Sequence, residues 1–371
     1  MSLAFLEALD GAEHEQIEIL QDPAIGFYAI VALHDTSAGP AFGGVRRHRY
    51  RNGAEALRDA LLLSRAMTYK CVMAGVPGGG GKTVLLDHPE LDAEKGYQRL
   101  GRFVENLGGR YYTGPDIGTG PRELAWIGAT TRFVTRPDAT GPGDLGRATA
   151  RGLFSGIRAV CRHLGPRDAR FPTEPDAQGL EGLRVLIQGL GEVGMNLAGM
   201  LHEAGARVLA AEVDADRLGQ AVDLWGVEPV PHEAALETDC ELWAPCALGG
   251  LLHDLTVGRL RCAAIAGSAN NLLARPEVAR MVHDRGVLLA PDYVVNSGAL
   301  ILGANFHLTG DRDQDAAIDR IGDELLTLFE RAEREGLPPS ELADRIASER
   351  LHARRGAPWF PAADLDVEAG R

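Results

Sequence analysis

The spacing of apolar and polar residues predicts strands and helices in the first part of the chain. Two runs rich in Ile, Val and Tyr within residues 16–33, QIEIL and FYAIVAL, predict strands. Residues 54–69 repeat apolar side chains at helical spacing, and a second helix is expected over 92–107. Between them, AGPAFGGVRRHRY is expected to form a glycine-rich turn, and TVLLD, which begins at Thr83, a short strand.

After about residue 147 the pattern alternates between strands and helices. LRVLIQ, RVLAAEVD, ELWAPCA, CAAIAGSAN and GVLLAPDYVV predict strands, whereas EVGMNLAGMLHEAG predicts a helix. This alternation is typical of an α/β fold whose parallel sheet is covered by helices on both faces. A Pro- and Gly-rich stretch at 134–147 indicates a domain junction, and the charged tail after about residue 311 is expected to be helical and to include a surface helix, ADRIASERLHARR.

Length and composition exclude several classes of protein. At 371 residues the chain is long for one hydrophobic core, so two domains are expected. The net charge of −14 argues against nucleic-acid binding, and no apolar run or leader pattern predicts a membrane or secreted protein. Five scattered cysteines without a C-x-x-C pair fit the cytoplasm and predict no metal site. Cys246 can be read as a nucleophile, but a small buried residue is the expected role.

A dinucleotide-binding fingerprint lies in the second half of the chain. It consists of Gly189, Leu190, Gly191, Glu192, Val193 and Gly194, between a predicted strand and a predicted helix. Gly189 permits a tight turn, Gly191 lets the backbone approach a pyrophosphate, and Gly194 lets helix and strand pack closely. Glu212 ends the next predicted strand, at the position where an acidic residue binds the adenosine ribose. An acid there favours NAD over NADP. Arg217 lies nearby and leaves NADP as the alternative.

Two lysines flank a run of four glycines in MTYKCVMAGVPGGGGKTVLL. The pair is Lys70 and Lys82, and it predicts a cationic pocket for an anionic small molecule. A phosphate loop is excluded, because that signature needs glycine where Val76 stands and a helix where Thr83 begins a strand. The glycines have no evident packing purpose, which favours a functional role for Lys82.

Eight phrases in order resemble the glutamate/leucine/phenylalanine/valine dehydrogenase family: GPAFGG, LSRAMTYK, GGGGK, TGPDIGT, GLGEVG, APCALG, GSANN and PDYVVNSG. The resemblance runs from about residue 25 to about residue 350. It implies an N-terminal α/β substrate-binding and oligomerisation domain over 1–146 and a Rossmann-type, doubly wound parallel-sheet NAD-binding domain over 147–324. Helices in 325–371 are expected to pack back on the first domain. The resemblance also implies an active site in the interdomain cleft and a homo-oligomer.

The resemblance further implies a reaction and a role for each matching residue. The reaction is reversible, NAD-linked oxidative deamination of an L-amino acid to a 2-oxo acid and ammonia. Lys70 is expected to anchor the substrate carboxylate, Lys82 to take a proton from the attacking water, and Asp116 to shuttle protons. Burial beside a second cation should lower the pKa of Lys82. Asp116 also fits ordinary turn chemistry after a proline. Further expected contacts are Gly43, Gly44, Met67, Gly114, Pro115 and Val294 for the substrate, and Thr149 and either Asn270 or Asn271 for the cofactor.

The residue at position 42 bears on the substrate. Phe42 stands where glutamate-specific members of the family carry a lysine, and an aromatic ring cannot neutralise a buried carboxylate. Glutamate is therefore disfavoured, and Phe42 is expected either to shrink the pocket or to stack on an aromatic substrate. The sequence favours an apolar, branched-chain or aromatic amino acid without fixing its size. Two alternatives are a relative recruited to make an aromatic 2-oxo acid for biosynthesis and a catalytically inactive NAD-binding regulatory homologue; retention of Lys70, Lys82 and Asp116 argues against the inactive homologue.

Overall fold

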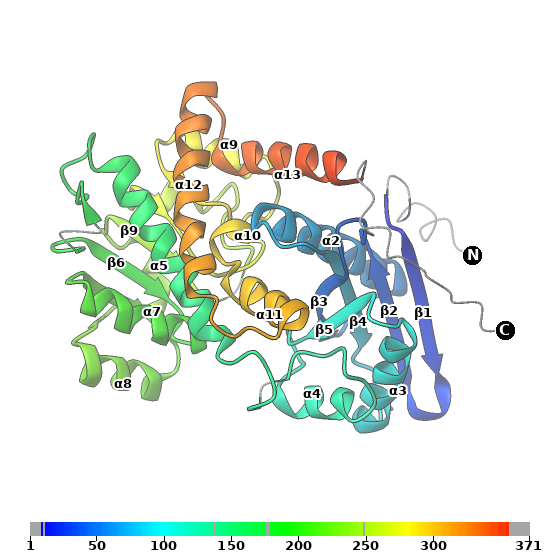
Figure 1. The fold of residues 1–371 in the computed structure, drawn as a ribbon. Helices are drawn as coiled ribbons and strands as arrows, with labels where there is room; N and C mark the ends of the chain where they lie inside the picture. The colour runs from blue at the N-terminus through cyan, green and yellow to red at the C-terminus, as the bar shows by residue number, and fades with distance from the viewer. Residues whose placement is uncertain (1–8, 10–11, 137, 176–178, 248, 356–371) are drawn as a thin grey trace. The chain divides into compact units, whose positions relative to one another are not determined.

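The protein is represented by a computed structural model that describes residues 9, 12–136, 138–175, 179–247 and 249–355 (Figure 1). The chain divides into two compact units, Met1–Arg136 with Ala347–Arg371 and Pro137–Ile346. These limits differ from the expected domain boundaries after residues 146 and 324. Residues 137–146, which were expected in the first domain, belong to the second unit. So do residues 325–346, which were expected to pack back on the first domain.

The first unit is built on a five-stranded mixed sheet. Its strands are β1 (Gln16–Asp22), β2 (Phe27–Leu33), β3 (Ala41–His48), β4 (Gly79–Leu86) and β5 (Tyr111–Gly114), in the order β1-β2-β4-β3-β5. A short 3₁₀ turn, η1 (Pro23–Ile25), joins the first two strands. The antiparallel pairs are β1–β2 and β2–β4, whereas β3 runs parallel to β4 and to β5.

Strand β3 corrects the prediction of a glycine-rich turn around GPAFGG. Gly43 and Gly44 lie inside this strand and pair with Thr113 and Gly114 of β5. Glycine is required because a Cβ at position 43 would lie 1.7 Å from the carbonyl oxygen of Gly81. The glycines therefore let neighbouring backbones approach each other instead of reversing the chain.

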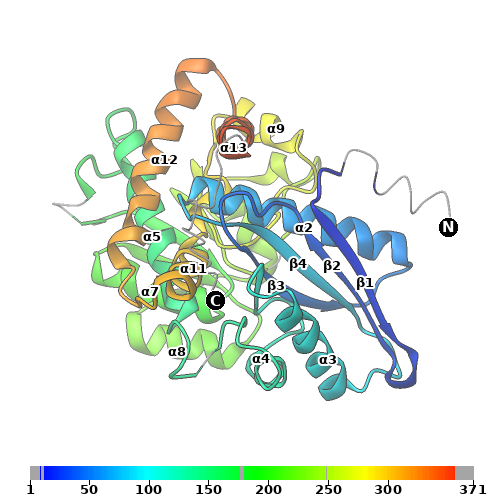
Figure 2. The ribbon, with the colours of Figure 1, turned by 45° about the vertical axis from the view of Figure 1, so that its right-hand side comes forward.

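Helices cover both faces of this sheet (Figures 1 and 2). Helix α2 (Gly53–Met73) packs on one face through an apolar cluster that includes Leu57 and Val84. Helices α3 (Ala93–Asn106) and α4 (Pro121–Gly128) pack on the other face. The side chain of Asn52 accepts a hydrogen bond from the backbone N–H of Glu55 and caps α2. The helices predicted over 54–69 and 92–107 are confirmed.

The glycine run brings α2 directly onto β4. A Cβ at Gly80 would lie 2.1 Å from the carbonyl oxygen of Ser64 and 2.2 Å from the backbone nitrogen of Thr68, both in α2. On the opposite face, a Cβ at Gly81 would lie 2.7 Å from the ring of Tyr111. The expectation that these glycines have no packing purpose is therefore wrong. They set the separation between the helix that carries Lys70 and the strand that carries Lys82.

The second unit contains a six-stranded parallel sheet. The strands are β6 (Arg184–Gln188), β7 (Arg207–Ala211), β8 (Glu228–Pro229), β9 (Leu242–Pro245), β10 (Ala264–Ile265) and β11 (Leu288–Leu289), in the order β11-β10-β9-β6-β7-β8. All neighbouring pairs are parallel. The strand order reverses between β6 and β9, the topological switch point at which such sheets bind ligands. The predicted Rossmann-type, doubly wound fold is confirmed.

The second unit also contains helices. They are α5 (Leu145–Leu164), α7 (Glu192–Glu203), α8 (Ala215–Trp225), α9 (Val278–Asp284), α10 (Asp292–Val295), α11 (Gly298–Thr309) and α12 (Asp315–Glu335), with 3₁₀ turns η2 (His232–Glu237) and η3 (Val257–Arg259). Helix α13 (Pro339–Arg355) begins in this unit. Helix α5 packs against α7, α11 and α12 (Figures 1 and 2).

Two predictions for the last third of the chain meet different outcomes. The strand expected throughout GVLLAPDYVV is limited to β11, because Pro291 ends the extended run and Asp292 begins α10. The predicted helix ADRIASERLHARR forms the larger part of α13, and its residues from Ala347 belong to the first unit. Residues 356–371 of the expected C-terminal helices lie outside the described residues. Among the residues described, no helix is both long enough and apolar enough to cross a membrane.

Candidate active site

Three strands of the first unit bring a buried cluster of charges together. Lys82 of β4 places its ammonium nitrogen 2.7 Å from Oδ2 of Asp116, which follows β5. Nε of Arg46, on β3, donates to the same carboxylate oxygen at 2.9 Å. The exposed fractions of these side chains are 7% for Lys82, 15% for Asp116 and 14% for Arg46. Asp116 also begins a turn, because its carbonyl oxygen accepts from the N–H of Thr119 at 2.9 Å, while its side chain pairs with the two cations.

This environment shifts the pKa values of both catalytic candidates. Burial lowers the pKa of Lys82, and Asp116, which raises it, does not cancel the effect. A nearby cation lowers the pKa of Lys82 further, and this cation is Arg46. From the sequence, Lys70 was the cation expected to have this effect. Burial raises the pKa of Asp116, but Lys82 and Arg46 reverse this shift and bring it to about 2. Asp116 is therefore a carboxylate at neutral pH.

Arg46 and its neighbours were not identified from the sequence. Nη1 of Arg46 lies 3.3 Å from Oδ2 of Asp59 on α2, and the hydroxyl of Tyr50 donates to the same carboxylate oxygen. The signal that would have identified Arg46 is the alternation of side chains between the two faces of a strand. Alternation along β3 places Phe42, Gly44 and Arg46 on one face. Reading this segment as a turn concealed that relationship.

Gly44, Gly114 and Pro115, three of the residues predicted to bind the substrate, lie next to Asp116. A Cβ at Gly43 would lie 3.6 Å from Cγ of Met67. A Cβ at Gly44 would lie 2.3 Å from the carbonyl oxygen of Pro115 and 3.0 Å from Cβ of Asp116, and Gly44 pairs with Gly114 across the β3–β5 ladder. These close approaches bring the backbone of Gly44 against the backbone of Pro115 and the Cβ of Asp116.

Lys70 and Phe42 belong to the same unit. Lys70 is half-buried in the last turn of α2, two residues after Thr68, which lies against Gly80. The ring of Phe42 is 4% exposed and stacks on Tyr112, with centroids 5.5 Å apart and an interplanar angle of 28°. A Cβ at Gly78 would lie 2.6 Å from the Phe42 ring, so glycine makes room for it. Position 42 thus contributes to an aromatic pair rather than a charge.

The glycine turn of the second unit fits the pyrophosphate of a dinucleotide. Gly189 has a φ of +99°, a conformation that favours glycine. Gly191 is the N-cap of α7, and a Cβ there would meet no atom within 4 Å, so its backbone is open to a ligand. A Cβ at Gly194 would lie 2.0 Å from the carbonyl oxygen of Gly189, which explains the close packing of helix and turn. Leu190, Glu192 and Val193 complete the segment.

Glu212 ties the end of β7 to this turn. Its Oε2 accepts from the backbone N–H of Leu190 at 2.5 Å, and its Oε1 accepts from the N–H groups of Val213 and Asp214 at 2.7 and 2.9 Å. Burial raises the pKa of Glu212, but these hydrogen bonds lower it overall, so the side chain is ionised. Arg217 pairs with Asp214 at 3.4 Å. Arg217, the cation that could pair with the 2′-phosphate of NADP, thus already has an anionic partner.

The remaining predicted residues of the second unit have varied surroundings. Thr149 lies on α5 and donates to the carbonyl oxygen of Leu145 at 2.9 Å, while Val294 is 2% exposed in α10. Oδ1 of Asn270 accepts from Nδ2 of Asn296 at 2.9 Å. Asn296, which sequence reasoning missed, is buried, and its Oδ1 has no hydrogen-bond partner in the described part of the chain. It is a further candidate for ligand contact.

Cys246 does not have the properties of a nucleophile. Cys246 was expected to be a small buried residue, and it is partly buried. Burial also raises the pKa of its thiol, which lowers the thiolate fraction at neutral pH.

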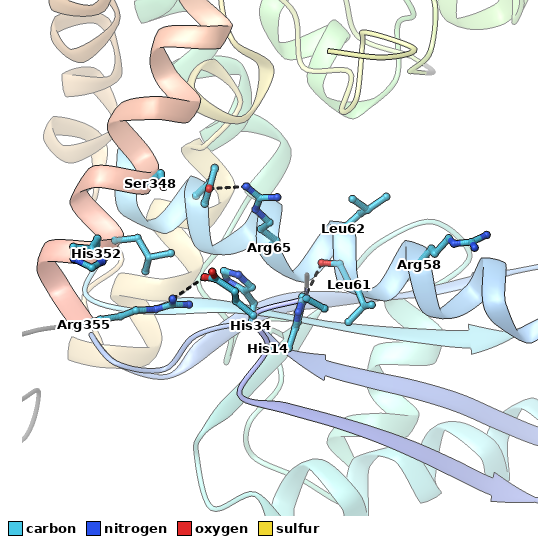
Figure 3. A pocket seen from close by; sticks show the side chains of 13 residues that line it. His14, His34, Arg58, Leu61, Leu62, Arg65, Ser348, His352 and Arg355 are labelled. Atoms are coloured by element: carbon cyan, nitrogen blue, oxygen red, sulfur yellow. Dashed lines mark hydrogen bonds and ion pairs between the residues drawn. The ribbon is translucent and has the colours of Figure 1, made fainter. Parts of the chain in front are cut away.

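A separate cavity of about 540 Å³ lies in the first unit (Figure 3). Arg58, Leu62 and Arg65 reach it from α2, and His352 and Arg355 from α13. None of the residues predicted for the active site lines this cavity. The candidate substrate site is therefore the charge cluster of the first unit, and the candidate dinucleotide site is the glycine turn of the second unit.

Comparisons with known proteins support the resemblance found in the sequence. The family model described as "Glu/Leu/Phe/Val dehydrogenase, dimerisation domain" matches residues 14–133. A leucine dehydrogenase from Thermoactinomyces intermedius is 36% identical, with 95% of each chain covered. A phenylalanine dehydrogenase from the same organism is 40% identical, with 93% of each chain covered. The chain belongs to the Glu/Leu/Phe/Val dehydrogenase family.

A solved structure extends this family assignment to the whole fold. The L-tryptophan dehydrogenase from Nostoc punctiforme superposes with a TM-score of 0.80 at 34% identity, and the match covers 95% of this dehydrogenase and 99% of that chain. The predicted family and enzyme class, an amino acid dehydrogenase, are confirmed.

Lysine usage in this dehydrogenase gives a signal that sequence reasoning missed. The chain has 38 Lys and Arg residues, of which three are lysines: Lys70, Lys82 and Lys95. Lysine, unlike arginine, can lose its proton near neutral pH when it is buried. A buried lysine in a chain that otherwise uses arginine indicates that position 82 needs an ionisable amine.

Proposed function

We propose that this protein catalyses the reversible, NAD-linked oxidative deamination of an apolar L-amino acid to a 2-oxo acid and ammonia. The observation that carries the proposal is the buried 2.7 Å ion pair between Lys82 and Asp116 in a member of this family. The backbone of Gly44 lies against Pro115 and the Cβ of Asp116, where a side chain at position 44 would collide with them.

The residues of the first unit supply binding and proton transfer. Lys70 holds the carboxylate of the amino acid, because a fixed cation is needed to orient an anionic substrate. After the substrate is oxidised to an iminium ion, water attacks its carbon, and Lys82 in its amine form takes the proton of that water. Asp116, which is ionised between two cations in the resting site, relays protons to and from the substrate nitrogen by transient protonation. Gly43, Gly44, Met67, Gly114 and Pro115 form the surface against which the substrate lies.

The second unit holds the dinucleotide. When bound, NAD supplies the hydride acceptor. The open backbone of Gly191 and the N-terminus of α7 would hold its pyrophosphate, and ionised Glu212 would accept hydrogen bonds from its ribose. A 2′-phosphate would meet the charge of Glu212, which supports NAD as the cofactor. We assign Thr149 and Asn270 to the same ligand, and Val294 to the apolar lining for the substrate.

The aromatic pair supports an apolar substrate. Phe42 and Tyr112 provide no charge to pair with the side-chain carboxylate of glutamate, and leaving that charge unpaired is unfavourable. The similar proteins include leucine, phenylalanine and tryptophan dehydrogenases, whose names refer to apolar amino acids. The name of the matching family model also supports a homo-oligomer, which light scattering can test.

The test measures NADH formation with a panel of L-amino acids. Leucine, valine, phenylalanine, tryptophan and glutamate are compared by kcat/KM, with NAD and with NADP. We expect turnover of apolar substrates with NAD and little turnover of glutamate. Faster turnover of glutamate would refute the argument from Phe42, and no turnover of any amino acid would support the inactive homologue instead.

A further inference from the structure

The charge cluster has a second layer that the reaction scheme does not use. Behind Asp116 lies Arg46, and behind Arg46 lies Asp59, which also accepts a hydrogen bond from Tyr50. The side chains of Arg46 and Asp59 are 14% and 26% exposed, so solvent screens them only in part. Alternating charges thus form a row that begins at Lys82, the most buried of the four side chains, continues through Asp116 and Arg46, and ends at Asp59, the most exposed.

An isolated pair of Lys82 and Asp116 would work against catalysis. A carboxylate 2.7 Å from an ammonium group stabilises the charged form, and in a buried site it holds the proton on lysine strongly. If Lys82 then lost its proton, Asp116 would remain as a buried, unpaired anion, which is unfavourable. Deprotonation of Lys82 therefore requires another partner for Asp116.

Arg46 meets this requirement by its geometry. Its Nε donates to Oδ2 of Asp116, the same oxygen that Lys82 contacts, at 2.9 Å against 2.7 Å for Lys82. A guanidinium does not deprotonate in proteins, so Arg46 keeps this bond at any pH at which the protein folds. Asp59 pairs with the other end of Arg46 and fixes its orientation.

We propose that Arg46 is a positioning residue that shares the Asp116 carboxylate with Lys82, so that Lys82 can release its proton while Asp116 stays paired and ionised. The inference rests on the proposed function, in which Lys82 is the base. Arg46 touches neither substrate nor cofactor in this scheme. Its effect reaches the reaction only through Asp116 and Lys82.

The charged groups around Lys82 predict opposite effects for two substitutions. They come from three elements: Asp116 after β5, Arg46 from β3 and Asp59 from α2. Burial lowers the pKa of Lys82 most, Asp116 raises it, Arg46 lowers it and Asp59 raises it. Arg46→Gln should therefore raise the pKa of Lys82, whereas Asp59→Asn should lower it. A role in packing alone would not produce shifts of opposite sign.

The titration of Lys82 can be observed without turnover. With lysine selectively ¹³C-labelled at Cε, the three lysines give three side-chain signals whose shifts follow ionisation, and Lys70→Arg and Lys95→Arg assist assignment. We expect Arg46→Gln to raise the midpoint of Lys82 by about 1–3 pH units, the range for a charge at this distance. Arg46→Lys, which keeps a cation, should stay near wild type. Arg49→Gln removes an exposed arginine that pairs with Asp87 and is the control.

Kinetics provide the second readout. The acid limb of kcat/KM for deamination should move to higher pH in Arg46→Gln and to lower pH in Asp59→Asn. An unchanged Lys82 midpoint in Arg46→Gln, or an equal shift in Arg46→Lys, would overturn the inference. If Arg46→Gln does not fold, Arg46→Lys and Asp59→Asn decide the question. If the midpoints move as expected but no amino acid is turned over, the proposed function is refuted. The electrostatic coupling of Arg46 to Lys82 is then still supported.

Discussion

The ammonium nitrogen of Lys82 and Oδ2 of Asp116 lie 2.7 Å apart in a site where both side chains are largely buried. The two residues are far apart in the sequence and meet because their strands, β4 and β5, both flank β3. Burial lowers the pKa of Lys82, while the two neighbouring cations hold the pKa of Asp116 at about 2. The pair thus combines an amine that can ionise with a carboxylate that stays charged.

Replacing Lys82 tests its assignment as the base. We expect Lys82→Ala to lower kcat for deamination by about 10²–10⁴-fold, the usual contribution of a general base. The measurement is the steady-state rate of NADH formation with the preferred amino acid. Lys95→Ala is the control, because Lys95 is exposed and pairs with Asp92 at the start of its own helix. Equal rates for Lys82→Ala and wild type would remove Lys82 from the mechanism.

Replacing Asp116 tests the contribution of the ion pair to folding. The folded-state pKa of about 2 lies below the usual value near 3.9. Ionised Asp116 therefore stabilises the folded protein, and its contribution is complete at pH values above about 3.9. We expect Asp116→Asn to lower the free energy of unfolding at pH 7 by up to about 3–5 kcal/mol, because two cations lose their partner. The difference from wild type should shrink as the pH falls from about 4 towards 2.

Urea unfolding at each pH where both proteins fold measures this difference. Asp239→Asn is the control, since Asp239 pairs with Arg184 but is 74% exposed. A difference between wild type and Asp116→Asn that does not change with pH would show that the carboxylate charge is not the source of the stability.

Replacing Gly80 tests the close contact between α2 and β4. The added methyl group of Gly80→Ala would lie about 2 Å from backbone atoms of Ser64 and Thr68. Backbone cannot move aside as a flexible side chain can, so we expect a loss of about 3 kcal/mol or more in the free energy of unfolding. Gly53→Ala, where no atom lies within 4 Å, should unfold as wild type does. Matching urea midpoints for the two variants would contradict this account of the glycine run.

Replacing Glu212 tests the choice of cofactor. We expect wild type to prefer NAD, and Glu212→Gln to lose at least about tenfold of that preference, equivalent to about 1.4 kcal/mol. Removal of the negative charge admits a 2′-phosphate, while the amide oxygen of Gln keeps one acceptor for the glycine turn. The measurement is kcat/KM for NAD and NADP with one amino acid. Asp223→Asn, at an exposed position of α8, should leave the ratio unchanged, and a wild-type preference for NADP would contradict the assignment.

Local patterns predicted much of this fold correctly. The strands around residues 16–33 and the helix that carries Lys70 follow from apolar periodicity, which depends on neighbours within a few turns. The glycine fingerprint and Glu212 were recognised for the same reason, since turn, helix start and strand end are adjacent in the sequence. GPAFGG was misread because glycine normally signals a turn, whereas here it admits the backbone of β4.

The amino-acid sequence by itself determined the family, the parallel sheet of the second unit, and the candidacy of Lys70, Lys82 and Asp116. Only the tertiary structure decided that Arg46 shares the oxygen of Asp116 that Lys82 contacts, and that Asp59 lies behind it. These residues come from β3 and α2, and their contacts depend on strand order and helix packing. The physical reason is that electrostatic coupling depends on distance and burial, and both are set by segments that are remote in the chain.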